Sequence, residues 1–312
     1  MKTPKQHSAA IFLAAQLIIL SNATHGQRIP TIFPTAILKS VVEIDTQDQS
    51  GQFRVHGTGF MVGRTITRGT NSTKAIFLVT AKHVLSDWTL DKPSNPSLVS
   101  SLRVHCYTGD LKPIEFAINP KAVDPGQFVC FHPDDKVDVA MIVLATSFMP
   151  SSNIFYLDQS MLLGYNGTNR LGGCSDTNLF QTGVQVFAVG YPYGVASDSE
   201  NLPLAMPAWV SSTPGKEFAT HVGTNELRGK IICLGGVVTY GNSGGPVFIP
   251  PQVIPVSAGL LITEPWVIGI CSSGAPSLSF AYSSDYILQL MDAFEQRIVD
   301  VRNDGATFVR RE

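Results

Sequence analysis

The stretch Gly241-Asn242-Ser243-Gly244-Gly245-Pro246 decides the fold, because it sets a serine among glycines. Such a loop leaves the serine hydroxyl accessible and lets backbone N–H groups converge on one point. Acyl transfer requires both a nucleophilic oxygen and donors aimed at the oxyanion that forms when it attacks. Apolar runs at 231–234 and 247–249 flank the loop and predict a turn between two strands. Taken alone, the loop fits an ordinary glycine-rich hairpin turn about as well.

The order of the candidate residues along the chain narrows the choice of fold. All seven histidines precede Ser243: His7, His25, His56, His83, His105, His132 and His221. The α/β-hydrolase order, in which the histidine follows the nucleophile, is therefore excluded. The order His…Asp…Ser of the two-barrel chymotrypsin type stays open, and so does the order Asp…His…Ser of the subtilisin type.

His83 is the best candidate for a general base, and Asp138 is the best candidate to orient it. His83 follows the apolar run 77–79 at a predicted strand end, where its side chain can face a cleft. Asp138 opens the apolar run 139–144, where a desolvated carboxylate needs a partner such as an imidazole N–H. Each also fits a structural role, a half-buried core histidine and a turn aspartate. Among the competitors, His56 precedes Gly57, His105 lies in a strand-like run, and His132 and His221 lie in loop-like sequence.

The same three stretches resemble the motifs of trypsin-like serine proteases. Residues 80–84 are similar to their Thr-Ala-x-His block, 138–141 to their Asp-Ile-Ala-Leu block, and 241–246 to their nucleophile loop. The asparagine before the serine, together with residues 57–60, 189–194 and 280–285, points to the high-temperature-requirement (Deg) branch. The resemblance covers roughly residues 36–295. It implies that His83 is the general base, that Asp138 orients it, that Ser243 attacks, and that the N–H groups of Gly241 and Ser243 form the oxyanion hole.

The sequence also departs from the family in ways that matter for activation. Digestive trypsin-like enzymes carry an aspartate before the nucleophile, and it pairs with a new N-terminus released by cleavage. Asn242 stands at that position, so we expect no such activation switch. Val84 replaces the cysteine of the disulfide beside the histidine. About 30 residues follow the last expected strand, too few for the PDZ domain common in the Deg branch.

The resemblance implies a pocket for the side chain that precedes the cut bond. The residue six before the nucleophile lies at the base of this pocket in trypsin-like enzymes, which gives Val237, with Val238 beside it. Ser272, Ser273 and Gly274 resemble the strand that lines the pocket and pairs with the substrate backbone. No charge is present at the base to pair with lysine or arginine. Cleavage after small or medium apolar residues is therefore expected.

Short apolar segments, with 27 glycines and 20 prolines, indicate an all-β chain. The expected fold is chymotrypsin-like, with two antiparallel six-stranded Greek-key β-barrels and a C-terminal α-helix. Residues 197–228 are expected to form a long irregular loop, and Ser284 is the expected N-cap of the helix. The expected divisions are a signal peptide at 1–26, a first barrel at 36–150, a crossover at 151–180, a second barrel at 181–283, and helix and tail at 284–312.

Composition and targeting signals indicate a secreted protein. Lys2 and Lys5 precede a mostly apolar run at 9–20 that is typical of a signal peptide and too short for a comfortable membrane span. Three N-x-[S/T] sequons begin at Asn22, Asn71 and Asn166. The net charge of −2 gives no electrostatic case for nucleic acid. The expected partners are protein or peptide substrates.

The cysteines show no spacing typical of zinc, and no metal or cofactor is expected. Five cysteines follow the leader, an odd number: Cys106, Cys130, Cys174, Cys233 and Cys271. Cys106 and Cys130 both fall in the expected first barrel and are the predicted disulfide pair, whereas Cys233 and Cys271 are predicted to be buried free thiols.

Three functions remain. The first is an active serine endopeptidase working through an acyl-enzyme. The second is a catalytically inactive relative that acts as a binding module, which the presence of all three reacting residues disfavours. The third is an esterase with the same triad, which the motifs disfavour.

Overall fold

The computed structural model describes residues 34–48, 50–68, 70–92, 94, 96–121, 128–144, 154–165, 180–196, 201–222, 225–236, 239–251, 253–256, 259–262, 264–275 and 277–303. The expected leader at 1–26, Cys174 and the sequon residue Asn166 lie outside the described residues. Two helical turns, α2 (Thr35–Leu38) and α3 (Lys82–Leu85), and one long helix, α4 (Ser284–Asn303), accompany the strands.

The first sheet holds eight strands around one apolar core. Its order is β5-β4-β1-β2-β3-β7-β6, with all neighbours antiparallel, and β8 pairs with β2 in parallel. Along β1, Val42 and Ile44 face the core while Glu43 and Asp45 face away from it, as the two-residue period of a strand requires. The strands are β1 (Val41–Gln47), β2 (Phe53–Arg68), β3 (Asn71–Thr80), β4 (Leu102–Tyr107), β5 (Pro113–Ile118), β6 (Val129–Phe131), β7 (Ala140–Leu144) and β8 (Leu157–Asp158).

The second sheet is a closed six-stranded barrel in the order β10-β13-β18-β17-β14-β9. Val186, Ile232 and Val247 are among the fully buried side chains that fill it. Its strands are β9 (Gln185–Gly190), β10 (Leu204–Val210), β13 (Ile231–Gly235), β14 (Pro246–Ile249), β17 (Trp266–Ala275) and β18 (Leu278–Ser283). We expected residues 197–228 to form a long irregular loop, and this prediction is wrong. They contain β10 and most of a hairpin formed by β11 (Phe218–Val222) and β12 (Asn225–Gly229).

The all-β, chymotrypsin-like fold with a C-terminal helix is thus confirmed. The first sheet differs in detail from the expected six-stranded barrel. Its pairings among the described residues do not close into a ring, and it has eight strands. β6, at one end of the order, is three residues long and offers few backbone groups for a further pairing. Part of the expected crossover also belongs to this sheet, since β8 lies within residues 151–180.

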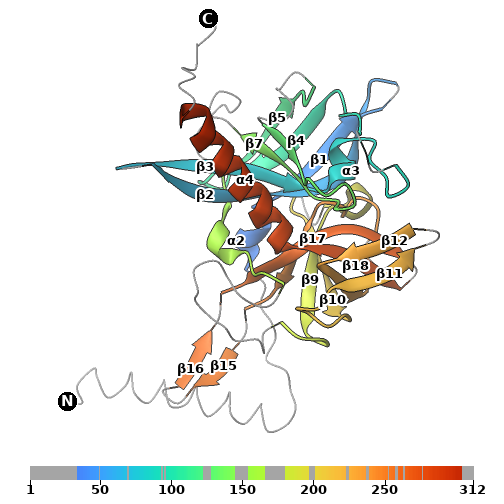
Figure 1. The fold of residues 1–312 in the computed structure, drawn as a ribbon. Helices are drawn as coiled ribbons and strands as arrows, with labels where there is room; N and C mark the ends of the chain where they lie inside the picture. The colour runs from blue at the N-terminus through green and yellow to red at the C-terminus, as the bar shows by residue number, and fades with distance from the viewer. Residues whose placement is uncertain are drawn as a thin grey trace, which may run out of the picture. The chain divides into compact units, whose positions relative to one another are not determined.

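Helix α4, dark red in Figure 1, ties the two sheets together. It contacts β6 and β7 of the first sheet and β17 and β18 of the barrel. Arg64 of β2 is buried and bonds to Asp292 and Glu295 of the helix. The N-cap is Ser283 rather than Ser284: the hydroxyl of Ser283 accepts from the N–H of Asp285 at 3.2 Å.

Strands β15 (Val253–Val256) and β16 (Gly259–Ile262) form an antiparallel hairpin that belongs to a separate unit. Within the described part of the chain, every helix is too short or too polar to cross a bilayer.

The predicted disulfide between Cys106 and Cys130 is wrong. Both residues are buried free thiols, as are Cys233 and Cys271. Cys106 lies on β4 and Cys130 on β6, and four strands stand between them in the sheet order. The Cys130 sulfur accepts a hydrogen bond from Arg297 of α4 at 2.9 Å.

Candidate active site

The structure joins His83 and Asp138 through two hydrogen bonds. His83 lies in α3, directly after β3, and Asp138 lies just before β7, which pairs with β3. The ring Nδ1 of His83 is 2.6 Å from Oδ2 of Asp138, and the backbone N–H of His83 donates to Oδ1 at 3.0 Å. The two bonds fix both the position and the orientation of the imidazole. Since Nδ1 binds the carboxylate, Nε2 is the ring atom available to take a proton.

The charges of this pair support each other in a buried setting. Asp138 is 0% exposed. Burial opposes its charge, but the charge of His83 and the hydrogen bonds from His83 and Ser272 lower the pKa of Asp138 below 3.8. Burial likewise favours a neutral imidazole, yet the charge and hydrogen bond of Asp138 raise the pKa of His83 above 6.5. The carboxylate therefore favours the imidazolium that a general base becomes.

Ser272 has a role that its sequence position did not reveal. We predicted that it lines the substrate pocket, but its buried hydroxyl donates to Oδ2 of Asp138. The pairing of β17 with β18 is irregular between Cys271 and Ser273, so that Ser272 has no paired residue on β18. Such a bulge re-aims a side chain, here toward the carboxylate. Ser273 and Gly274, the next residues, are exposed.

The loop that carries Ser243 requires its glycines. Gly241 has a φ of +95°, and a Cβ there would lie 2.2 Å from the carbonyl oxygen of Tyr191. Gly244 has a φ of +87°, and a Cβ there would lie 2.1 Å from the carbonyl oxygen of Thr58. A side chain at either position would be strained and would clash with backbone. The loop is therefore held tightly against both β2 and the segment after β9.

Hydrogen bonds from the first sheet hold the same loop. The N–H of Thr58 donates to the Ser243 carbonyl at 2.8 Å, and the Thr58 hydroxyl donates to the Gly241 carbonyl at 2.6 Å. Within the described part of the chain, the N–H groups of Gly241 and Ser243 bind no acceptor, whereas the N–H groups of Gly244 and Gly245 both do. The two predicted oxyanion donors are thus uncommitted.

The hydroxyl of Ser243 does not bond to His83. Among the described residues its partner is the carbonyl of Ser272, to which it donates at 3.0 Å. The structure thus brings His83 and Asp138 into contact and links Ser243 to them only through Ser272, whose hydroxyl binds Asp138 and whose carbonyl binds Ser243.

Asn242 is buried and uncharged. It is 0% exposed. Its side-chain amide donates to the Thr239 hydroxyl at 3.2 Å, while no described residue donates to its Oδ1. An aspartate here would bury an unpaired charge.

Lys82, next to His83, is a second residue whose role the sequence did not reveal. Its ammonium is buried and lies within 3.5 Å of the backbone carbonyls of His132, Asp134 and Asp135. Burial lowers the pKa of Lys82, although the nearby carboxylates, Asp138 first, oppose the shift. These contacts fix the turn that leads into Asp138.

A cavity of about 350 Å³ adjoins the pair. It is lined by His83, Asp138, Ser272, Ser273 and Tyr282, by the 88–90 segment, and by Leu227 of the β11–β12 hairpin. Its walls come from both sheets.

The predicted pocket base and the other candidate histidines are not part of the contact between His83 and Asp138. Val237 and Val238, the predicted pocket base, lie outside the described residues. His56 approaches the carbonyl of His83 at 3.4 Å, and burial lowers its pKa. His132 bonds to Gln289 of α4 at 2.8 Å. His105 lies on the far side of β1 from β2, in a cluster with Glu43 and Asp45.

Comparison with protein-family models found no match, and comparison with curated proteins found none either. Among solved structures, the chain is similar to Rv3671c from M. tuberculosis H37Rv in an inactive serine-to-alanine form, at 18% sequence identity. The TM-score is 0.43, and the match covers 85% of this chain and 91% of that one. It is similar to a second inactive form, the Rv3671c protease, at 17% identity and a TM-score of 0.42, covering 85% and 99%. It is also similar to Deg5, at 18% identity and a TM-score of 0.45, covering 82% and 88%. These scores are too low to assign a function.

Proposed function

We propose that this protein is a secreted serine endopeptidase in which His83, Asp138 and Ser243 form a catalytic triad. The observation that carries the proposal is the hydrogen-bonded pair of His83 and the fully buried Asp138 beside a glycine-rich serine loop. Among the described residues, a buried carboxylate on Nδ1, an Nε2 with no other partner and two N–H groups with no acceptor supply the parts that acyl transfer needs.

The proposed reaction has two steps. Ser243 Oγ attacks the carbonyl carbon of the peptide bond and gives its proton to Nε2 of His83, while the N–H groups of Gly241 and Ser243 bind the oxyanion. The C–N bond then breaks, and His83 returns the proton to the leaving amine. Water, with His83 again acting as base, hydrolyses the resulting ester of Ser243. Asp138 stays ionised throughout and stabilises the imidazolium.

Substrate binding would also release the nucleophile. The Ser243 hydroxyl donates to the carbonyl of Ser272. A substrate backbone paired with Ser272–Gly274 presents an N–H to that carbonyl and competes for it. Rotation of Ser243 about χ1 then turns its hydroxyl toward His83. A peptide offers this N–H whereas a simple ester need not, which favours peptidase over esterase activity.

Three finer features belong to the same proposal. Cleavage follows small or medium apolar residues, with Val237 and Val238 at the pocket base. The leader at 1–26 directs export from the cytoplasm. Its removal is sufficient for activation, because Asn242 needs no charged partner.

The alternative is an inactive relative that acts as a binding module, and one observation favours it. The described residues include no hydrogen bond between Ser243 and His83. Incubation of the mature protein with a proteome-derived peptide library, followed by mass spectrometry of the new termini, separates the two. The proposal requires new C-termini ending in small or apolar residues, absent from a matched Ser243→Ala sample. Equal cleavage by both proteins, or none by either, would contradict it.

A further inference from the structure

A cluster of charged side chains covers the outer face of the first sheet, away from the cavity beside His83. Since Ile44 and Val104 point into the core, their neighbours on β1 and β4 point outward. Glu43 of β1 pairs with His105 of β4, and His105 pairs with Glu115 of β5. The register thus places one histidine between two carboxylates on three adjacent strands.

Three of these side chains offer ligand atoms within 4.8 Å of one another: Glu43, Asp45 and His105. Two carboxylates and an imidazole are suitable ligands for a borderline divalent metal ion. Ligands that share a tetrahedral zinc ion with bond lengths of about 2.1 Å lie about 3.4 Å apart. Nε2 of His105 and Oδ2 of Asp45 are already 3.2 Å apart. An oxygen of Glu43 lies within 4.8 Å of the ligand atoms of the other two residues and would complete the set after rotation of its side chain.

Asp45 supplies an independent indication that a ligand belongs here. The residue is 3% exposed, yet its Oδ1 is buried and has no hydrogen-bond partner among the described residues. Its other oxygen, Oδ2, accepts from Arg103 at 2.6 Å. A buried carboxylate oxygen without a donor is costly, and an ion held by both oxygens of Asp45 would remove that cost.

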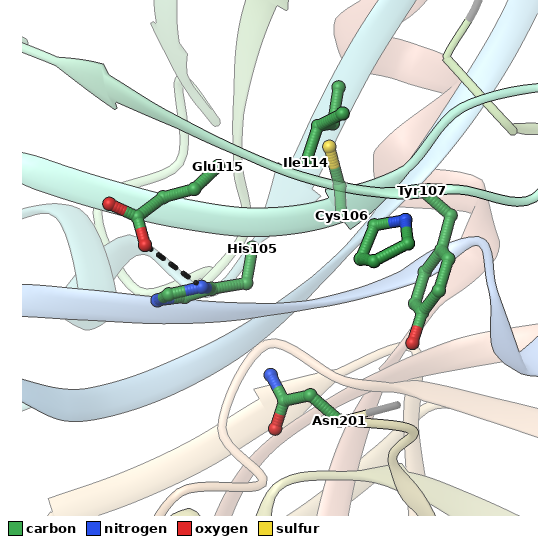
Figure 2. Close-up of a pocket in the computed structure, with 7 residues that line it drawn as sticks. His105, Cys106, Tyr107, Ile114, Glu115 and Asn201 are labelled. Atoms are coloured by element: carbon green, nitrogen blue, oxygen red, sulfur yellow. Dashed lines mark ion pairs between the residues drawn. The ribbon is translucent and has the colours of Figure 1, made fainter. Parts of the chain in front are cut away.

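The surroundings resemble the outer shell of a metal site. Metal-binding histidines usually place their second nitrogen against a carboxylate or carbonyl. Nδ1 of His105 lies 3.3 Å from Oε2 of Glu115, the contact marked by the dashed line in Figure 2. Asn201 enters from the segment before β10 and donates to Oε2 of Glu43 at 2.7 Å. The three ligands are therefore held in place by Glu115, Asn201 and Arg103.

The cluster also has access, space and a suitable net charge. A cavity of about 750 Å³ is lined by Glu43, Asp45 and His105, and leaves space for water ligands. Glu43, Asp45 and Glu115 carry three negative charges, and Arg103 carries one positive charge. Arg54, which also lines the cavity, is paired with Asp48. With His105 neutral, the group retains an excess of negative charge that a divalent ion would balance.

We propose that Glu43, Asp45 and His105 bind a divalent transition-metal ion of the zinc class, with water completing its coordination. The ion would join β1 to β4 next to the Asn201 segment. The sequence alone did not suggest this site, because its ligands come together only when the strands pair in register. The proposal does not depend on peptidase activity.

Cobalt(II) is a direct probe, because its visible absorption reports tetrahedral coordination by protein ligands. The mature protein is titrated with Co²⁺, and Zn²⁺ is then added to displace it, with equilibrium dialysis to count bound metal. We expect one ion per chain at micromolar metal, and at least a hundred-fold weaker binding in His105→Gln. Glu43→Gln should weaken binding as well and covers the case in which His105→Gln fails to fold.

Two control variants locate the site. His221→Gln changes an exposed histidine on β11, and His83→Ala removes the histidine beside Asp138. Both should bind Co²⁺ like the unmodified protein. Absence of saturable binding below millimolar metal would overturn the proposal. Binding that survives both Glu43→Gln and His105→Gln, or that is lost in His83→Ala, would overturn it too.

Discussion

Replacement of Ser272 by alanine tests the unexpected bond between this hydroxyl and Asp138. The buried carboxylate accepts from the ring and the backbone N–H of His83 and from Ser272. A hydrogen bond to a charged group contributes about 1.5–3 kcal/mol to stability. Ser272→Ala should lower the free energy of unfolding by about that amount. The two bonds from His83 remain, so Asp138 stays ionised at neutral pH.

The expected effect on activity is smaller than the effect of losing a triad residue. Asp138 keeps its charge and its contact with His83, but it loses one of its three restraints. We expect kcat/KM to fall roughly tenfold, which corresponds to about 1.4 kcal/mol. The pH at which activity appears should rise slightly, because a carboxylate with fewer donors stabilises the imidazolium more strongly.

The matched control is Ser273→Ala, which removes an exposed hydroxyl one residue along β17. Urea unfolding and peptide hydrolysis across pH would be measured for both variants. The reasoning fails if Ser272→Ala matches Ser273→Ala in both stability and pH profile.

The other predictions follow from the same geometry. In steady-state peptide assays, Ser243→Ala and His83→Ala should each reduce turnover by on the order of a million-fold, because the triad acts as a unit. Asp138→Asn should reduce turnover by about ten-thousand-fold. Near-native turnover in Ser243→Ala would exclude Ser243 as the nucleophile. The pKa of His83 is raised and the base must be neutral, so kcat/KM should rise with pH through an inflection above pH 6.5. In Asp138→Asn this inflection should move to lower pH. An unchanged inflection would contradict the effect of Asp138 on the pKa of His83. Asn242→Asp should destabilise the fold by about 3 kcal/mol in urea unfolding, since it buries an unpaired charge, and unaltered stability would show that the site tolerates an anion.

The sequence predicted the parts of the site that local motifs encode. The order of His83, Asp138 and Ser243, together with the resemblance of their flanking motifs to those of trypsin-like serine proteases, led to the chymotrypsin-like fold and to the contact between His83 and Asp138. The glycine-rich loop around Ser243 stood out in the sequence, and the positive φ angles of Gly241 and Gly244 explain why glycine is needed there.

Features that depend on long-range pairing could not be predicted. The bulge that turns Ser272 toward Asp138 and the register that aligns Glu43 with His105 both depend on neighbouring strands. The predicted disulfide between Cys106 and Cys130 failed for the same reason. Both residues belong to the first sheet, but their strands are not neighbours in it. The strands within 197–228 were missed because prolines and glycines interrupt their short apolar runs.

Labelling with a fluorophosphonate probe tests the central claim most directly, because the probe reacts only with a serine that a neighbouring base activates. Mature, uncut protein would be treated with the probe, digested and mapped by mass spectrometry, with His83→Ala as the matched control. The account predicts a single adduct on Ser243 that is lost in His83→Ala. An unlabelled protein, or an adduct on another serine, would contradict it.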